Sequence, residues 1–158
     1  MRRRVALPAF VVLVAGGCAN GKAPEQSAGP VAAGASVPSD LTIVCGAGGG
    51  FTGEWEGRTV KPDGAVLAWR GLGAEEHPVP AGRLSPDARR ALWDAINAAR
   101  FFEVERHEPG NMTALVRVTA GGRTHEASWP LAEDAAAEPG SLDALYATCR
   151  DVVDRTER

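Results

Sequence analysis

Two turn signals do most to limit how this chain can fold, because each lies between segments of alternating apolar and polar residues. Pro62-Asp63-Gly64 supplies the fixed φ, the side-chain acceptor and the positive φ that a three-residue hairpin loop needs, while Gly121-Gly122 suits a two-residue loop. We therefore expect two antiparallel hairpins, over residues 54–70 and 112–129. Antiparallel sheets need only one covered face, so these turns favour a sheet packed on one side.

The turns also determine which residues face one another. If Lys61 pairs with Ala65, then Trp55, Leu67 and Trp69 share one side of the first hairpin. The simplest interpretation of the two tryptophans is packing against the sheet. The alternative is an aromatic platform that binds a sugar.

The second hairpin has one apolar side and one charged side. A two-residue loop sets Val118 opposite His125 on the apolar side and Arg117 opposite Glu126 on the other. This division is typical of an antiparallel sheet that is covered on a single face.

Two helices are predicted from capping residues and apolar spacing. Ser85-Pro86-Asp87 starts the first helix, because Ser caps a free amide, Pro suits the first position and Asp meets the positive end of the dipole. Its apolar face consists of Ala88, Leu92, Ala95, Ile96 and Ala99. The second helix begins near Ser141, with Asp143 in its first turn. Its apolar stripe consists of Leu142, Leu145, Cys149, Val152 and Val153. Phe101 and Phe102 are expected to pack the end of the first helix onto the sheet.

The expected fold is an α+β domain over residues 41–158. The apolar run Leu41 to Cys45 suits a buried strand, so an antiparallel sheet of four or five strands would pack against two helices. Gly46 to Gly50 is expected to be a turn or bulge. A phosphate-binding loop is the alternative, but the segment lacks the lysine and the following helix that such a loop uses.

The first eighteen residues have the organisation of an export signal. Three arginines precede an apolar run over residues 5–14 that is too short to span a bilayer. Val14-Ala15-Gly16-Gly17-Cys18 resembles the bacterial lipobox, with Ala15 where leucine is usual. We therefore expect residues 1–17 to be a lipoprotein signal peptide and Cys18 to carry a diacylglyceryl thioether and an acylated amine. An ordinary secretory signal is the alternative.

Lipidation at Cys18 would hold the protein on a membrane of the cell envelope, since several acyl chains bind far more firmly than one. Ala19 favours the periplasmic face of the outer membrane if the source is Gram-negative. After Cys18, the segment 19–40 is rich in Ala, Gly, Pro and Ser, which is typical of a flexible linker. Removing the signal leaves 14 Lys and Arg against 20 Asp and Glu, a balance that argues against nucleic-acid binding.

Cys45 and Cys149 are the two cysteines outside the export signal. An even number in an oxidising compartment, near the two ends of the folded region, favours a disulfide between them. Two buried free thiols are the alternative. No C-x-x-C pair or nearby histidine favours a metal or redox site.

Residues with catalytic or metal-binding chemistry are sparse. Glu103, Glu105 and His107 alternate and form the best metal hypothesis, although such charge runs are usually solvated. Glu54 and Glu56 would suit a glycosidase only if they faced a cleft. The chain lacks G-x-S-x-G and H-E-x-x-H motifs. We therefore expect no catalytic residue, no cofactor and no bound metal.

The order of the segments 48–71, 84–102 and 108–130 resembles a group of small uncharacterised bacterial lipoproteins. More distantly, it is similar to the emfourin family of metalloprotease inhibitors, through Gly49-Gly50-Phe51-Thr52-Gly53 and the helix that ends in Phe101-Phe102. The second resemblance implies inhibition of a protease, without identifying the inhibitory residues.

These observations together predict a non-catalytic envelope module that binds another protein, with protease inhibition as the specific candidate. Phe51, Trp55 and Trp69 are the candidate binding residues. The competing hypothesis is a small-ligand binder or a hydrolytic enzyme of the envelope.

Replacing Cys18 tests the anchor directly. Because the lipids attach to its sulfur and its amine, Cys18→Ser should abolish labelling by radioactive palmitate and release the protein in soluble form. Membrane fractionation and labelling in cells measure both effects. Unchanged labelling of the variant would rule out lipidation at this residue.

Overall fold

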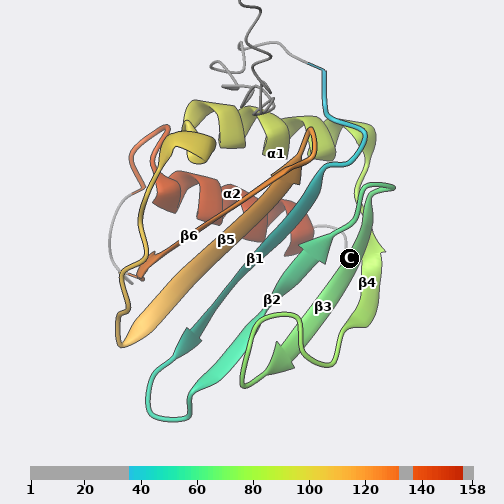
Figure 1. The fold of residues 1–158 in the computed structure, drawn as a ribbon. Helices are drawn as coiled ribbons and strands as arrows, with labels where there is room; N and C mark the ends of the chain where they lie inside the picture. Colours follow the sequence, from blue (N-terminus) through green and yellow to red (C-terminus); the bar gives the residue numbers. More distant parts are fainter. Residues whose placement is uncertain (1–35, 132–136, 155–158) are drawn as a thin grey trace, which may run out of the picture.

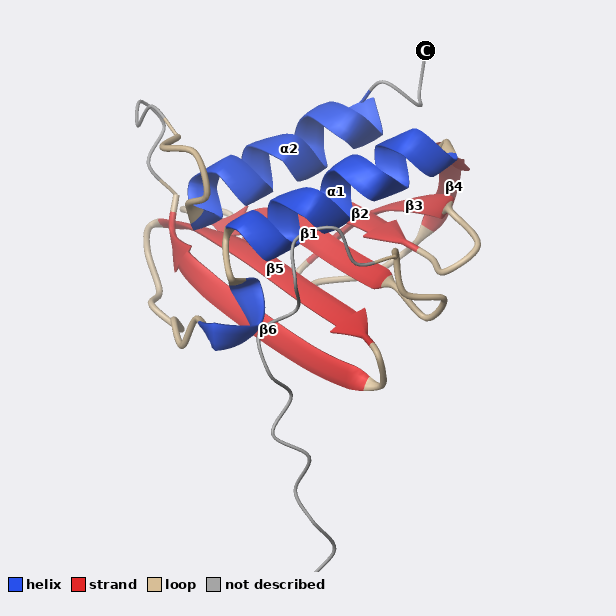
Figure 2. Cartoon of the chain, turned by 90° about the horizontal axis from the view of Figure 1, so that it is seen from above, coloured by secondary structure: helices blue, strands red, loops and turns tan. Residues whose placement is uncertain are grey.

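Six antiparallel strands form one sheet, and two helices cover one of its faces (Figure 1 and Figure 2). The computed structural model describes residues 36–131 and 137–154. The strand order is β4-β3-β2-β1-β5-β6. The strands are β1 (Thr42–Gly49), β2 (Glu54–Val60), β3 (Ala65–Gly71), β4 (Val79–Arg83), β5 (Met112–Ala120) and β6 (Arg123–Pro130). The helices are α1 (Pro86–Ala98), a short 3-10 turn η1 (Phe101–Glu103) and α2 (Leu142–Asp154).

The predicted α+β class is confirmed, but the predicted count of four or five strands is wrong. The missed strand is β4, which pairs with β3 at the edge of the sheet. It contains Pro80 and Gly82 and is mostly exposed, so it lacks the alternation of apolar residues that identifies a strand in a sequence. Proline is tolerated there because an edge strand can leave one side of its backbone unpaired.

Both predicted hairpin registers are confirmed. The Lys61 amide donates to the Ala65 carbonyl at 2.8 Å, which closes the first loop. Trp69 then lies opposite Gly57. In the second hairpin, Val118 lies opposite His125. The alternation of faces follows directly from these pairs.

The expected loop over Gly46 to Gly50 is wrong, because β1 continues as a strand to Gly49. The glycines serve a different purpose, which is to let two tryptophan rings lie against the sheet. A Cβ added to Gly46 would come within 2.5 Å of the Trp69 ring, and one added to Gly57 within 2.3 Å of the same ring. A Cβ at Gly48 would lie 2.2 Å from the Trp55 ring.

The main core lies between the sheet and the helices. Helix α1 begins as predicted, with the Ala88 amide donating to the Ser85 hydroxyl at 3.1 Å. The largest fully buried side chains of this core are Trp93, Trp129, Phe101, Leu41, Ile43, Leu92, Ile96 and Leu145. Within the described residues, no helix is long and apolar enough to cross a bilayer.

A disulfide joins Cys45 of β1 to Cys149 of α2, as predicted. The two residues are 104 positions apart in sequence, and both are almost completely buried. The bond therefore attaches the last helix to the middle of the sheet.

Asp40 attaches the beginning of the described chain to the opposite hairpin. Its carboxylate accepts hydrogen bonds from the Gly121 amide at 2.8 Å and the Gly122 amide at 2.7 Å. These two bonds, that of Gly122 first, hold the pKa of Asp40 below its ordinary value of 3.8. Asp40 thus fixes the point at which the chain enters the domain.

Removing the disulfide should destabilise the domain. In the chain-entropy model a crosslink over about 100 residues contributes at most about 4 to 5 kcal/mol, so Cys45→Ala with Cys149→Ala should lower the midpoint of urea unfolding strongly. A reducing agent should lower the native protein to the same midpoint and leave the double variant unchanged. Equal midpoints for oxidised and reduced native protein would contradict the bridge.

The Asp40 contact should contribute stability only while its carboxyl is ionised. Because its pKa is lower in the folded state than in the unfolded state, the contribution is complete above about pH 5 and is lost as the pH falls through the folded pKa. The difference in unfolding midpoint between the native protein and Asp40→Asn should therefore shrink as the pH falls below 3.8. A difference that stays constant from pH 7 to pH 2.5 would contradict this role.

Candidate functional site

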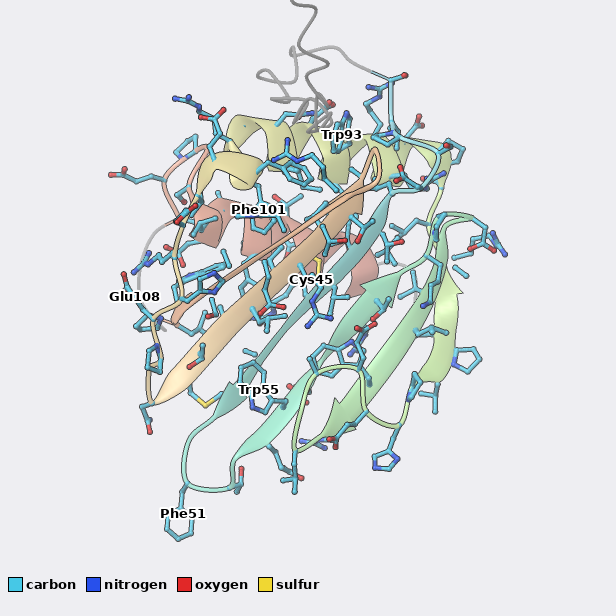
Figure 3. The ribbon with its side chains drawn as sticks, in the orientation of Figure 1. Cys45, Phe51, Trp55, Trp93, Phe101 and Glu108 are labelled. Atoms are coloured by element: carbon cyan, nitrogen blue, oxygen red, sulfur yellow. A yellow bond between two sulfur atoms is a disulfide. The ribbon has the colours of Figure 1, made fainter. Side chains whose placement is uncertain are left out.

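Phe51 is the most exposed large apolar side chain at the end of the sheet, in the turn between β1 and β2. Gly50 and Gly53 adopt positive φ angles of 63° and 67°, which form the tight turn and are unfavourable for other residues. The Gly53 amide closes the turn on the Gly49 carbonyl at 3.1 Å. Phe51 is fully exposed and points away from the domain (Figure 3). We call residues 49–53 the tip.

A groove of about 650 Å³ lies next to the tip. It is bounded by the ends of β1, β2 and β3 on one side and by α2 on the other. Its lining side chains include Phe51, Glu54, Trp55, Glu56, Arg58, Arg70, Met112, Leu131, Tyr146 and Arg150. Ala47 and Glu56 are paired across the sheet on the face that the helices cover, so most of the groove belongs to that face.

The charges of the groove are unevenly arranged. Arg70 lies 3.9 Å from the Glu54 carboxylate and 3.5 Å from the Glu56 carboxylate, so one arginine is shared by two glutamates. All three side chains are more than half exposed, at 67%, 54% and 69%. Exposed ion pairs of this kind contribute little to stability.

The α2 side of the groove has a different chemistry. The guanidinium of Arg150 lies 5.9 Å from the centre of the Tyr146 ring, a cation–π contact. Burial raises the pKa of the Tyr146 phenol above its ordinary value of 10.0. The hydroxyl therefore stays protonated at neutral pH and can donate a hydrogen bond.

The three predicted binding residues lie near one end of the sheet but differ in exposure: Phe51 and Trp55 line the groove, whereas Trp69 belongs to a buried cluster against which Trp55 packs. Phe51 is fully exposed, Trp55 is partly exposed on the face without helices, and Trp69 is only 2% exposed. Trp69 is packed against Val44 and Leu115, with Ala74 of the β3–β4 loop beside it. Its ring therefore has no surface to offer a ligand, and its role in this arrangement is packing.

The β3–β4 loop is held over this face by Glu75. The Thr59 hydroxyl donates to its carboxylate at 2.9 Å, and Arg117 donates to it at 3.0 Å. Arg117 also binds Glu126 at 2.7 Å, the cross-strand pair that the second hairpin predicts. Figure 1 shows the loop in front of the sheet, on the side opposite the helices.

The sequence-based metal hypothesis does not correspond to a cluster. Glu103 ends η1 and pairs with Arg100, while His107 forms an isolated bridge with Ser128 of β6. Throughout the described part of the chain, no three His, Cys, Asp or Glu side chains are close enough to hold a metal ion.

His125 has a structural partner. Its Nε2 lies 2.6 Å from the Val104 carbonyl, and its ring contacts Phe101 edge-on at 5.3 Å between ring centres. This pair confirms that Phe101 fastens the end of α1 to the sheet. His125 therefore packs between η1 and the sheet as a structural residue.

Sequence reasoning missed the groove. Arg70 and Arg150 are 80 positions apart, and nothing in the sequence shows that α2 places them on one surface. The exposed position of Phe51 has a signal in the sequence, because the glycines on both sides of it indicate a turn at the surface. Cys18 and most of the linker expected over residues 18–40 lie outside the described residues.

No protein-family model matches the chain, and no curated protein is significantly similar to it in sequence. The exposed tip and the groove beside it are therefore the features from which a function has to be inferred.

Proposed function

We propose that this chain is a lipid-anchored module of the bacterial cell envelope that binds another protein through its tip and performs no catalysis itself. The observation that carries the proposal is the full exposure of Phe51 on a glycine turn beyond the end of the sheet. Aromatic side chains dominate the energetics of protein interfaces, where they enter pockets of the partner and lose their contact with water. An exposed phenylalanine on a hydrogen-bonded turn is arranged for such a contact.

The position of the tip supports a protein partner over a bilayer. Strand β1 has eight residues, which corresponds to about 26 Å, and Phe51 follows its far end. The chain enters at the near end, beside Asp40. A lipid at Cys18 and a linker over residues 18–40 would therefore join the domain on the side away from the tip. The tip would then face the envelope space.

The disulfide supports the envelope location. Disulfides persist in oxidising compartments and are rare in reducing ones. The bond between Cys45 and Cys149 thus agrees with export, which the signal at residues 1–17 predicts independently.

A metalloprotease is the specific candidate partner. The emfourin resemblance includes the tip segment Gly49-Gly50-Phe51-Thr52-Gly53, and Phe51 of this segment protrudes beyond the end of the sheet (Figure 3). A convex loop with an aromatic residue fits a concave protease cleft.

A second candidate is a small-ligand binder, which the groove favours because its volume of about 650 Å³ lies in the range of small-molecule sites. A hydrolase would need carboxylates directed at a substrate. Glu54 and Glu56 are instead both paired with Arg70.

Truncating the tip tests the proposal. Loss of an aromatic anchor typically costs about 2 kcal/mol or more, so Phe51→Ala should weaken inhibition of a thermolysin-like protease about thirtyfold. Crosslinking in intact envelopes should show a matching loss of the captured protein. Leu72→Ala is the control, because Leu72 is also an exposed apolar residue but lies on the β3–β4 loop.

If Phe51→Ala binds and inhibits as strongly as the native protein, the tip is not the binding surface. If no envelope protein is captured and no protease is inhibited, the protein-binding proposal fails altogether.

A further inference from the structure

The β3–β4 loop, residues 72–78, is strained at two positions. Glu75 and His77 have φ angles of 63° and 47°, in the left-handed region that is unfavourable for residues with a Cβ. Strain of this kind persists only where the surrounding contacts enforce it, and it is concentrated in clamps and switch segments. The contacts that hold this loop against the sheet therefore indicate what the loop does.

The Glu75 carboxylate fastens the loop to the sheet. It accepts hydrogen bonds from the Thr59 hydroxyl of β2 at 2.9 Å and from the Arg117 guanidinium of β5 at 3.0 Å. Thr59 and Arg117 both pair with Val44 of β1, one on each side, so the bridge crosses β1. Because hydrogen bonds to a charged group are about twice as strong as neutral ones, this carboxylate is a firm attachment.

The loop covers an apolar surface on the face without helices. Trp69, Val44 and Leu115 are buried there, with exposed fractions of 2%, 3% and 9%. Ala74 of the loop packs against them, whereas the side chain of Leu72 is 75% exposed. Since an alanine buries little apolar area, this contact alone would hold the loop weakly.

The closed position also isolates a polar group. The ring of Trp69 lies under the loop, and its Nε1 is buried without a hydrogen-bond partner among the described residues. Such burial is unfavourable, because the group has lost its hydrogen bonds to water. Lifting the loop would let water reach this ring. It would also let water replace the lost hydrogen bonds of Glu75, Thr59 and Arg117, so that opening leaves these groups satisfied.

We propose that the β3–β4 loop is a lid with Glu75 as its latch, and that it opens locally to uncover an apolar surface formed by Trp69, Val44 and Leu115. The strained backbone and the buried indole favour opening, whereas the two hydrogen bonds of Glu75 oppose it. The uncovered surface continues to Trp55, which packs against the same cluster and is partly exposed. The lid belongs to the helix-free face, so this inference does not depend on the proposed role of the tip.

The indole proton of Trp69 reports the opening, and that of Trp93 in α1 is a matched reference. Both side chains are 2% exposed, and both Nε1 atoms lack a hydrogen-bond partner within the described ranges, but Trp93 belongs to the main core. Exchange of the two protons for deuterium is followed by NMR on the full-length protein in detergent.

The Trp69 proton should exchange at least about tenfold faster than the Trp93 proton, because a local opening is more frequent than a larger unfolding. Low concentrations of urea should leave the Trp69 rate unchanged, since lifting the lid exposes little surface. The same concentrations should accelerate exchange of the Trp93 proton.

Removing the latch should raise the exchange rate of the Trp69 proton. Glu75→Ala loses both hydrogen bonds and should accelerate exchange at least about tenfold, whereas Glu75→Gln can still accept a bond from Thr59 and should accelerate it less. The matched control is Glu126→Ala, which removes the other carboxylate bound to Arg117. The open position keeps that contact, so this variant should change the rate by no more than about twofold.

Three outcomes would overturn the proposal. If the Trp69 proton exchanges no faster than the Trp93 proton, the surface is uncovered only when the domain unfolds. If Glu75→Ala leaves the Trp69 rate unchanged, Glu75 is not a latch. If Glu126→Ala accelerates exchange as much as Glu75→Ala, the ion pairs stabilise the whole face, and the loop is not a separate lid.

Discussion

Trp69 can lie against the sheet only because Gly46 and Gly57 have no Cβ, and the arrangement of the whole β1–β3 region depends on this contact. The ring covers the backbone of two neighbouring strands and is itself 2% exposed. Any larger residue at either glycine would force the ring or the strands to move, a change that typically costs about 1–3 kcal/mol. The same packing lets β1 continue in register with β2 to Gly49. The tip therefore connects two strands that are regularly paired up to Gly49 and Glu54.

The features that the sequence predicts well are local ones. Pro62-Asp63-Gly64 and Gly121-Gly122 determine the pairing of their flanking strands, so the two registers follow from turn chemistry alone. The Ser85 cap is equally local. The disulfide is predictable for another reason, since Cys149 lies on the apolar stripe of its helix and Cys45 on a buried strand.

The features that the sequence does not predict depend on contacts between distant segments. A glycine run normally indicates a loop, and only the tryptophan rings explain why β1 includes Gly46 and Gly48 as strand residues. Edge strand β4 contains Pro80 and has no periodic pattern to detect. The groove requires Arg70 and Arg150 to meet at one surface, which depends on how α2 crosses the sheet.

The tip and the groove differ in what they can contribute to binding. An apolar anchor such as Phe51 supplies affinity when it is buried, whereas charges such as that of Arg150 mainly increase the association rate and exclude partners of the wrong charge. The proposed lipid at Cys18 would add a third contribution, because a tethered domain meets membrane-bound partners at a raised effective concentration. With such a tether, a modest intrinsic affinity is sufficient. The burial of Trp69 then has a simple consequence: its ring is covered by the β3–β4 loop, whereas Phe51 and the apolar side chains of the groove stay accessible at this end of the domain.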